Sequence, residues 1–191
     1  MLSAGINRFV LSLDGPNAKI SKSITRSEND FDQTVEAIKN IKNKNVEIGV
    51  TIVINKLNYQ YMSEMFELSD HLDVDFINVQ FLLPYVEDKN VQCRKLPPTV
   101  IPKYADVTPI LKQALDDYGK KIKIHIHFIP FCYLIGYEQY LIPESIKEDR
   151  LVLNYQGFFY NIGEHLRKGC IKVDKCEKCE YNILCIGFPK N

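Results

Sequence analysis

The chain has 191 residues, of which 46% are hydrophobic and 25% are charged, and its 24 basic side chains balance its 24 acidic ones. These values are typical of a globular protein with one domain, or with a domain and a small appendage, and they exclude an extensively disordered chain. Zero net charge gives no overall field that favours nucleic acid or an anionic membrane, so we expect neither as a partner.

The N-terminal segment gives no sign of a secretory leader. It reads MLSAGINRFV, without the basic-then-apolar order of such a leader. No apolar run approaches the ~20 residues that a membrane-spanning helix needs. We therefore expect a cytoplasmic protein, in which six cysteines are better explained by metal than by disulfides.

Four apolar runs predict the strands of an α/β protein. The runs are 9–13, 47–54, 76–83 and 122–129. The first three are almost continuously apolar and rich in Val and Ile, as in strands covered on both faces. Helical patterns at 31–42, 59–71 and 102–118 separate the runs.

The helix ends carry recognisable signals. Ser27 or Asn29 can cap the first predicted helix, and Asn58 is better interpreted as a cap of the second than as a ligand contact. Pro102 suits a first turn, and Gly119 suits a stop.

Strands and helices alternate, and the strands start about 30 to 45 residues apart, which is the period of βαβ units. Right-handed crossovers then give a parallel sheet or part of a barrel, although four strands cannot close a barrel. Because the chain begins almost at a strand, with Gly5 resembling the end of a helix, we expect a fragment of a larger enzyme. The periodicity ends near residue 130, so we expect two parts, 1–129 and 130–191.

The second part is expected to be irregular. A short helix is expected at 131–140 and a strand pair at 151–160.

Polar side chains follow the first two predicted strands. Ser12 and Asp14 lie in LSLDGP, Arg26 lies in the connection that follows, and Asn55 follows the second strand. The carboxyl ends of parallel strands carry ligands in α/β proteins, so these groups can hold a ligand with hydroxyls and a carboxylate. The alternative is that Asp14 only forms a turn.

His125 and His127 alternate with isoleucine in the fourth strand and share one face. Two histidines on one face can bind metal, but a paired polar face at an edge strand is the better interpretation.

The densest chemical signal is CxxCxxxxxC, formed by Cys176, Cys179 and Cys185. Three thiolates at this spacing can form one face of a zinc site or an iron-sulfur cluster. The candidates for a fourth ligand are Cys132, Cys170 and His165. The alternative is a set of buried thiols or a disulfide pair.

Three segments resemble the second half of the radical S-adenosylmethionine core barrel. They read GINRFVLSLDGPNAKISKSITRSENDFDQTVEAIKNIK, VEIGVTIVINKLN and VDFINVQFLLP. The tail CEKCEYNILCIGF resembles the extension that holds an auxiliary [4Fe-4S] cluster in SPASM or twitch enzymes. The resemblance covers about residues 2–85 and 130–187.

The resemblance implies a partial (β/α)6 barrel with S-adenosylmethionine at the carboxyl ends of its strands, and radical formation by electron transfer from a [4Fe-4S] cluster. By the same resemblance, Ser12 and Asp14 lie near the ribose and methionine moiety, and Arg26 neutralises the methionine carboxylate. Leu82 and Leu83 pack against adenine.

The family's CxxxCxxC, which binds the radical-generating cluster, is absent from this sequence. The first three barrel strands are also absent, so the chain alone is expected to be inactive, and that cluster is expected on a missing N-terminal part. Pro189 stands where the longer SPASM pattern has its last cysteine. This favours one auxiliary cluster on Cys132, Cys176, Cys179 and Cys185, with Cys170 as a substitute for Cys132.

As partners, the resemblance implies a peptide or protein substrate and an electron donor such as flavodoxin or ferredoxin. The rival hypotheses are a non-catalytic zinc-binding α/β module and a binding module with reduced, metal-free cysteines. Cys93, in the loop at 84–98, is read as a free thiol.

Overall fold

The computed structural model describes residues 5–42, 44–82, 98–143, 151–153, 159–161 and 167–190. Its centre is a parallel sheet of four strands in the order β1-β2-β3-β4. The strands are β1 (Arg8–Ser12), β2 (Glu47–Ile54), β3 (Phe76–Phe81) and β4 (Lys123–His127). The predicted α/β class is confirmed.

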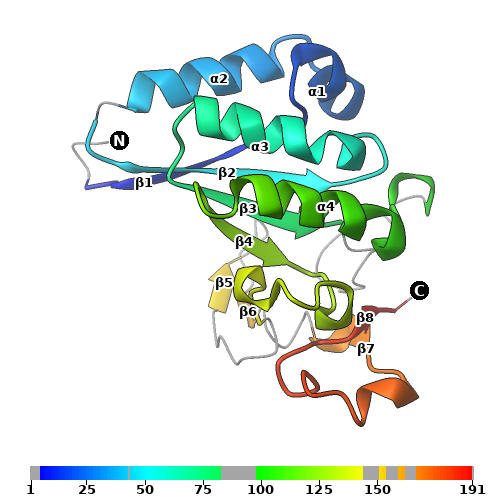
Figure 1. Cartoon of the computed structure of the whole chain (residues 1–191). Coiled ribbons are helices and arrows are strands. Elements are labelled where there is room, and N and C mark those ends of the chain that lie inside the picture. Colours follow the sequence, from blue (N-terminus) through cyan, green and yellow to red (C-terminus); the bar gives the residue numbers. More distant parts are fainter. Residues whose placement is uncertain are drawn as a thin grey trace.

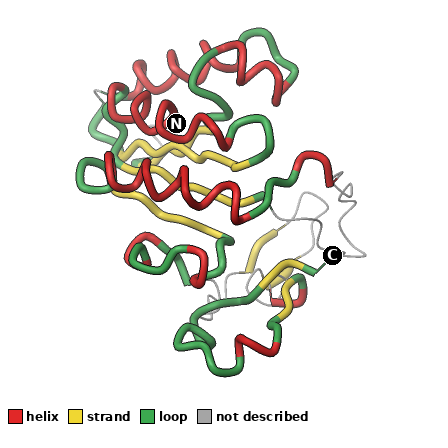
Figure 2. The backbone as a smooth tube through the Cα atoms, turned by 45° about the vertical axis from the view of Figure 1, so that its right-hand side comes forward, coloured by secondary structure: helices red, strands yellow, loops and turns green. Residues whose placement is uncertain are grey.

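Four helices lie on one side of this sheet, as Figures 1 and 2 show. They are α1 (Ala18–Thr25), α2 (Asp30–Ile41), α3 (Met62–His71) and α4 (Tyr104–Tyr118). Right-handed crossovers between strands in sequential order place every connecting helix on the same face. Short 3-10 turns precede α3 and α4, at η2 (Tyr59–Tyr61) and η3 (Pro98–Val100).

The two faces of the sheet differ because side chains alternate along each strand. In β2, Ile48, Val50, Ile52 and Ile54 are buried in the core, which the helices complete. The prediction that β1 is covered on both faces is wrong: its burial alternates, and Val10 on the other face is 49% exposed.

Helix α1 was not predicted from the sequence. It begins at Asn17, whose side-chain oxygen accepts a hydrogen bond from the Ile20 backbone N–H at 3.1 Å. It ends at Arg26, which adopts the left-handed conformation with φ 60°. Arg26 therefore lies at a helix end rather than in an open connection.

The strand ends and helix ends differ from expectation in small ways. β3 ends at Phe81, and Leu83 lies outside the described residues together with the loop that contains Cys93. α4 stops at Gly119 as expected, but with a right-handed φ of −64°. Asn29 stands at the start of α2 without a side-chain cap bond.

The chain after β4 forms turns instead of the expected helix. These are η4 (Phe131–Tyr133) and η5 (Glu138–Tyr140), after which Leu141 bridges to Ile126 of β4. Leu134 and Leu141 are buried in the same core as the sheet. The boundary near residue 130 stays a prediction.

Two small antiparallel pairs complete the described chain. The expected strand pair is present as β5 (Leu151–Leu153) and β6 (Phe159–Asn161). The second pair is β7 (Cys170–Ile171) with β8 (Phe188–Pro189), and the turn η6 (Asp174–Cys176) lies between its strands.

Within the part of the chain that is described, no helix is both long enough and apolar enough to cross a membrane.

Asn58 links the carboxyl ends of strands β1 and β2 through side-chain hydrogen bonds. Its side chain is fully buried and donates to the backbone oxygens of Asp14, at 3.1 Å, and Val53, at 2.9 Å. Its own oxygen accepts from the Asn55 backbone N–H at 2.8 Å. Asn58 stands at the N-cap position of η2 as predicted, but its side chain makes no cap bond and joins the ends of β1 and β2 instead.

We expect Asn58→Leu to lower the free energy of unfolding by about 3 kcal/mol, because the Asp14 oxygen and the Asn55 N–H lose their side-chain partner and the Val53 oxygen keeps only the Asn55 amide, at 3.3 Å, within the described chain. Urea unfolding measures the change. Asn40→Ala, at an exposed position on α2, is the control and should stay within about 0.5 kcal/mol of wild type. Equal losses of unfolding free energy in the two variants would contradict the role of Asn58 in linking β1 to β2.

Candidate functional site

Cys132, Cys176, Cys179 and Cys185 line one small pocket, with a free volume of about 20 Å³. Cys132 comes from the turn that follows β4, and the other three come from the segment between β7 and β8. Cys132 is exposed, and the other three are half-buried. Thiols far apart in the sequence are thus brought to one place.

Tight turns organise the three cysteines of the C-terminal segment. The backbone N–H of Cys179 donates to the Cys176 oxygen at 3.2 Å, and that of Cys185 donates to the Tyr181 oxygen at 2.8 Å. The backbone N–H of Gly187 lies 3.4 Å from the Cys185 sulfur and donates to it. The last of these bonds shows that the loop already directs a donor at a candidate ligand.

Tyr181 attaches this segment to the turn that bears Cys132. Its ring stacks on Phe131 with 5.1 Å between centroids, and its hydroxyl donates to Glu138 at 2.8 Å. Glu138 also accepts from the Gly136 backbone N–H at 2.9 Å, and these donors lower the pKa of its carboxyl, with Gly136 the largest cause. A charged acceptor and a stacked ring therefore hold the two cysteine-bearing segments together.

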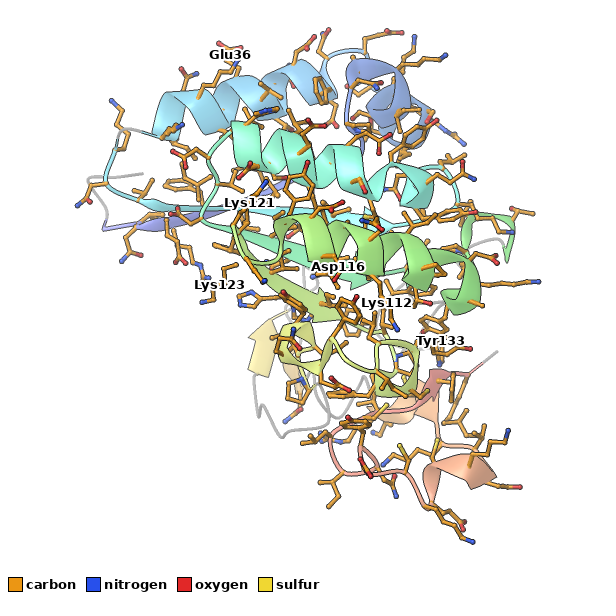
Figure 3. The ribbon with its side chains drawn as sticks, viewed as in Figure 1. Glu36, Lys112, Asp116, Lys121, Lys123 and Tyr133 are labelled. Atoms are coloured by element: carbon orange, nitrogen blue, oxygen red, sulfur yellow. The ribbon has the colours of Figure 1, made fainter. Side chains whose placement is uncertain are left out.

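Helix α4 supports the same turn from its other side. The Tyr137 hydroxyl donates to the Asp116 carboxylate at 2.8 Å, and the Lys112 ammonium donates to the Ile135 oxygen at 3.4 Å. Figure 3 labels Lys112 and Asp116 on α4. The turn is thus held between α4 and the C-terminal segment.

The four thiols interact electrostatically. Burial raises the pKa of the Cys132 thiol, and the nearby Cys185, Cys179 and Cys176 raise it further. The Cys132 thiol therefore resists deprotonation unless a positive charge lies close to it. Four thiols around a shared pocket are the donor set of an iron-sulfur cluster or a zinc ion.

The positions of the four sulfurs affect whether a zinc ion or an iron-sulfur cluster can bind. Among the residues described, no three His, Cys, Asp or Glu side chains lie close enough together to hold one metal ion. A single zinc needs all its sulfurs about 2.3 Å from one point, whereas a cluster is bound by sulfurs spread around it. By residue type the four thiols suit either group.

The other candidates for a fourth ligand lie elsewhere. Cys170 is buried in β7 and does not line the pocket. His165 is outside the described residues.

The residues predicted at the carboxyl edge of the sheet are only partly brought together. Ser12 is exposed at the end of β1, and Asp14 is half-buried, with a pKa raised by burial and then by Asp30. Arg26 is exposed, and no hydrogen bond or ion pair joins it to Asp14 or Ser12 in the described part of the chain. Leu82 continues from β3, its backbone N–H 3.3 Å from the Ile54 oxygen.

A row of polar side chains crosses the face of the sheet that the helices leave uncovered. Strand register aligns Ser12, Thr51, Asn78 and His125 as successive neighbours. The His125 ring nitrogen lies 3.1 Å from the Asn78 oxygen. The prediction that His125 and His127 share a polar face on an edge strand is confirmed by this register.

Next to this row, the ring of Phe76 covers part of the same face of the sheet. Phe76 is buried over Gly49, where an added Cβ would lie 2.2 Å from the ring. The Arg8 guanidinium covers the ring at 4.4 Å and pairs with Glu47 at 3.0 Å. Burial, followed by Lys123, His127 and Arg8, lowers the pKa of His125, so its neutral form is favoured.

Sequence reasoning missed Tyr181 and Asn182, which line the pocket, and Glu138, which accepts the hydrogen bond from Tyr181. Tyr181 lies inside the cysteine motif, and its position between two candidate ligands was a usable signal. Nothing in the sequence pairs Glu138 with Tyr181, because 43 residues separate them.

No family model matches the chain. Over 81 residues it is 26% identical to the AdoMet-dependent heme synthase of Oleidesulfovibrio alaskensis. The matched region covers 42% of this chain and 21% of that protein, so the match spans about a fifth of the relative's length. The relative's name states a dependence on S-adenosylmethionine, the cofactor that the sequence resemblance implies. The comparison thus indicates a distant relation to an enzyme that uses this cofactor.

Proposed function

We propose that this chain is the C-terminal part of a radical S-adenosylmethionine enzyme and carries the site of an auxiliary [4Fe-4S] cluster. The observation that carries the proposal is the shared pocket of four thiols from two distant segments, next to a parallel sheet with polar groups at its carboxyl edge. The similarity to an AdoMet-dependent enzyme supports the same conclusion.

In this proposal Cys132, Cys176, Cys179 and Cys185 hold the cluster. Cysteine thiolates are the usual ligands of such clusters, and the cluster supplies one-electron chemistry when bound. Its positive iron ions favour the deprotonated thiols, which offsets the raised pKa of Cys132. A structural zinc ion is the competing occupant.

Ser12 and Asp14 are the proposed contacts of the S-adenosylmethionine ribose and methionine moiety, with Arg26 near the methionine carboxylate and Leu82 and Leu83 near adenine. Asn58 supports this role because it holds the Asp14 backbone by a buried hydrogen bond.

The substrate is proposed to be a peptide or protein. The uncovered polar row from Ser12 to His125 supports this class, since hydroxyl, amide and imidazole groups can pair with peptide N–H and C=O groups.

Anaerobic reconstitution of the full chain with iron and sulfide tests the cluster. We expect a brown protein with about four iron atoms and about four sulfides per chain, as a [4Fe-4S] cluster requires. Metal and sulfide analysis after desalting gives the stoichiometry. Tight zinc binding with no iron uptake would show that the cluster assignment is wrong.

The fourth ligand is identified by a matched pair of variants. We expect Cys132→Ala to reduce bound iron to about three atoms or fewer, because one iron loses its thiolate. Cys170→Ala should keep the wild-type iron content, since Cys170 does not line the pocket. If Cys170→Ala lost iron and Cys132→Ala kept the wild-type content, Cys170 would be the fourth ligand in place of Cys132.

The S-adenosylmethionine site is tested at Asp14. We expect Asp14→Asn to weaken binding about tenfold, because a charge-assisted hydrogen bond to a hydroxyl becomes a neutral one. Since the pKa of Asp14 is raised, affinity should also fall as the pH drops through a value above that of an ordinary aspartate. Equilibrium dialysis on the iron-loaded chain measures both effects.

Asp32→Asn, at an exposed position in the first turn of α2, is the control for Asp14→Asn. It should leave the affinity unchanged. Equal S-adenosylmethionine affinities for wild type and both variants would show that Asp14 does not contact this cofactor.

A further inference from the structure

The walls of the cysteine pocket carry hydrogen-bond donors as well as thiols. Lys172, Asn182 and Gly187 line it together with the four cysteines. None of these three residues is among the candidate metal ligands. Metal binding alone therefore does not explain why these hydrogen-bond donors line the pocket.

Gly187 shows that one of these donors is fixed by the backbone. Its N–H donates to the Cys185 sulfur at 3.4 Å, and its φ is +89°. A Cβ at this position would lie 2.3 Å from the Ile171 backbone oxygen. A close crossing of two backbones, which a side chain would block, thus directs this N–H at a candidate ligand.

Asn182 presents a buried polar atom without a partner. Its side-chain oxygen is inaccessible to solvent and accepts no hydrogen bond within the described chain. The oxygen and nitrogen of an amide exchange places when the group turns over, with little change in shape. Turned over, the amide places its N–H donors at this buried position beside the pocket.

Lys172 adds a positive charge at the rim. Its ammonium donates to the backbone oxygen of Asn182, so the cation is held beside the same loop. An ammonium has two further N–H donors available.

We propose that Asn182, Lys172 and the Gly187 N–H form a donor shell that raises the reduction potential of the bound cluster. Adding one electron to the cluster makes it more negative, and hydrogen bonds to its sulfurs and a nearby cation stabilise that reduced form. The shell makes the site an acceptor of single electrons from a low-potential donor, rather than a structural brace alone. The inference rests on the proposed function, because it requires the cluster.

The test is a potentiometric titration of the reconstituted full chain, with dithionite as reductant and electron paramagnetic resonance of the reduced cluster as readout. For Asn182→Leu and for Lys172→Gln we expect a more negative midpoint. At a fixed potential the ratio of reduced to oxidised cluster should fall by about tenfold in each, which is ~59 mV for a one-electron couple.

Lys190→Gln is the matched control, because Lys190 is exposed in the same C-terminal segment and does not line the pocket. Its midpoint should equal that of wild type. Asn182→Asp keeps the shape of the side chain while removing the donor and adding a negative charge, and should lower the midpoint further.

Different results would overturn the proposed cluster and the proposed donor shell. A wild-type chain that takes up no iron overturns the proposed function and this inference with it. Full iron and sulfide in every variant, with midpoints equal to that of Lys190→Gln, overturns the donor shell alone.

Discussion

The candidate site depends on the contact between Tyr181 and the turn that follows β4. The stacking of Tyr181 on Phe131 and its hydrogen bond to Glu138 bring the segment with three cysteines to Cys132. Sequence spacing alone places three thiols near one another through the CxxC turn and its short loop. The fourth joins them because this contact, together with the packing of Tyr133 on Phe188, connects residues far apart in the chain.

The parallel sheet explains why two candidate sites lie on the same side of the molecule. Parallel strands in sequential order bring all four carboxyl ends to one edge, and the helices of the described segments cover one face. Ser12 and Asp14 leave this edge from β1, while Cys132 leaves it from β4 after a few residues. The carboxyl edge with Ser12 and Asp14, the polar row and the cysteine pocket are therefore consequences of one topology.

The sequence predicted those elements whose signals are periodic. The apolar runs gave the four strands to within two residues at each end, and α2, α3 and α4 followed from apolar stripes. It did not predict α1, whose eight residues carry few apolar side chains after a Gly-Pro turn, or the role of Asn58, whose partners lie on two strands. The CxxCxxxxxC spacing identified three pocket residues, whereas Glu138 and Asn182 depend on tertiary packing that no local pattern encodes.

X-ray absorption spectroscopy of the reconstituted chain tests the central claim most directly, because it reports the neighbours of the bound metal. The account predicts iron surrounded by sulfur with other iron atoms close by, as in a cluster held by four thiolates. A single zinc with four sulfurs at about 2.3 Å and no metal neighbour would contradict it.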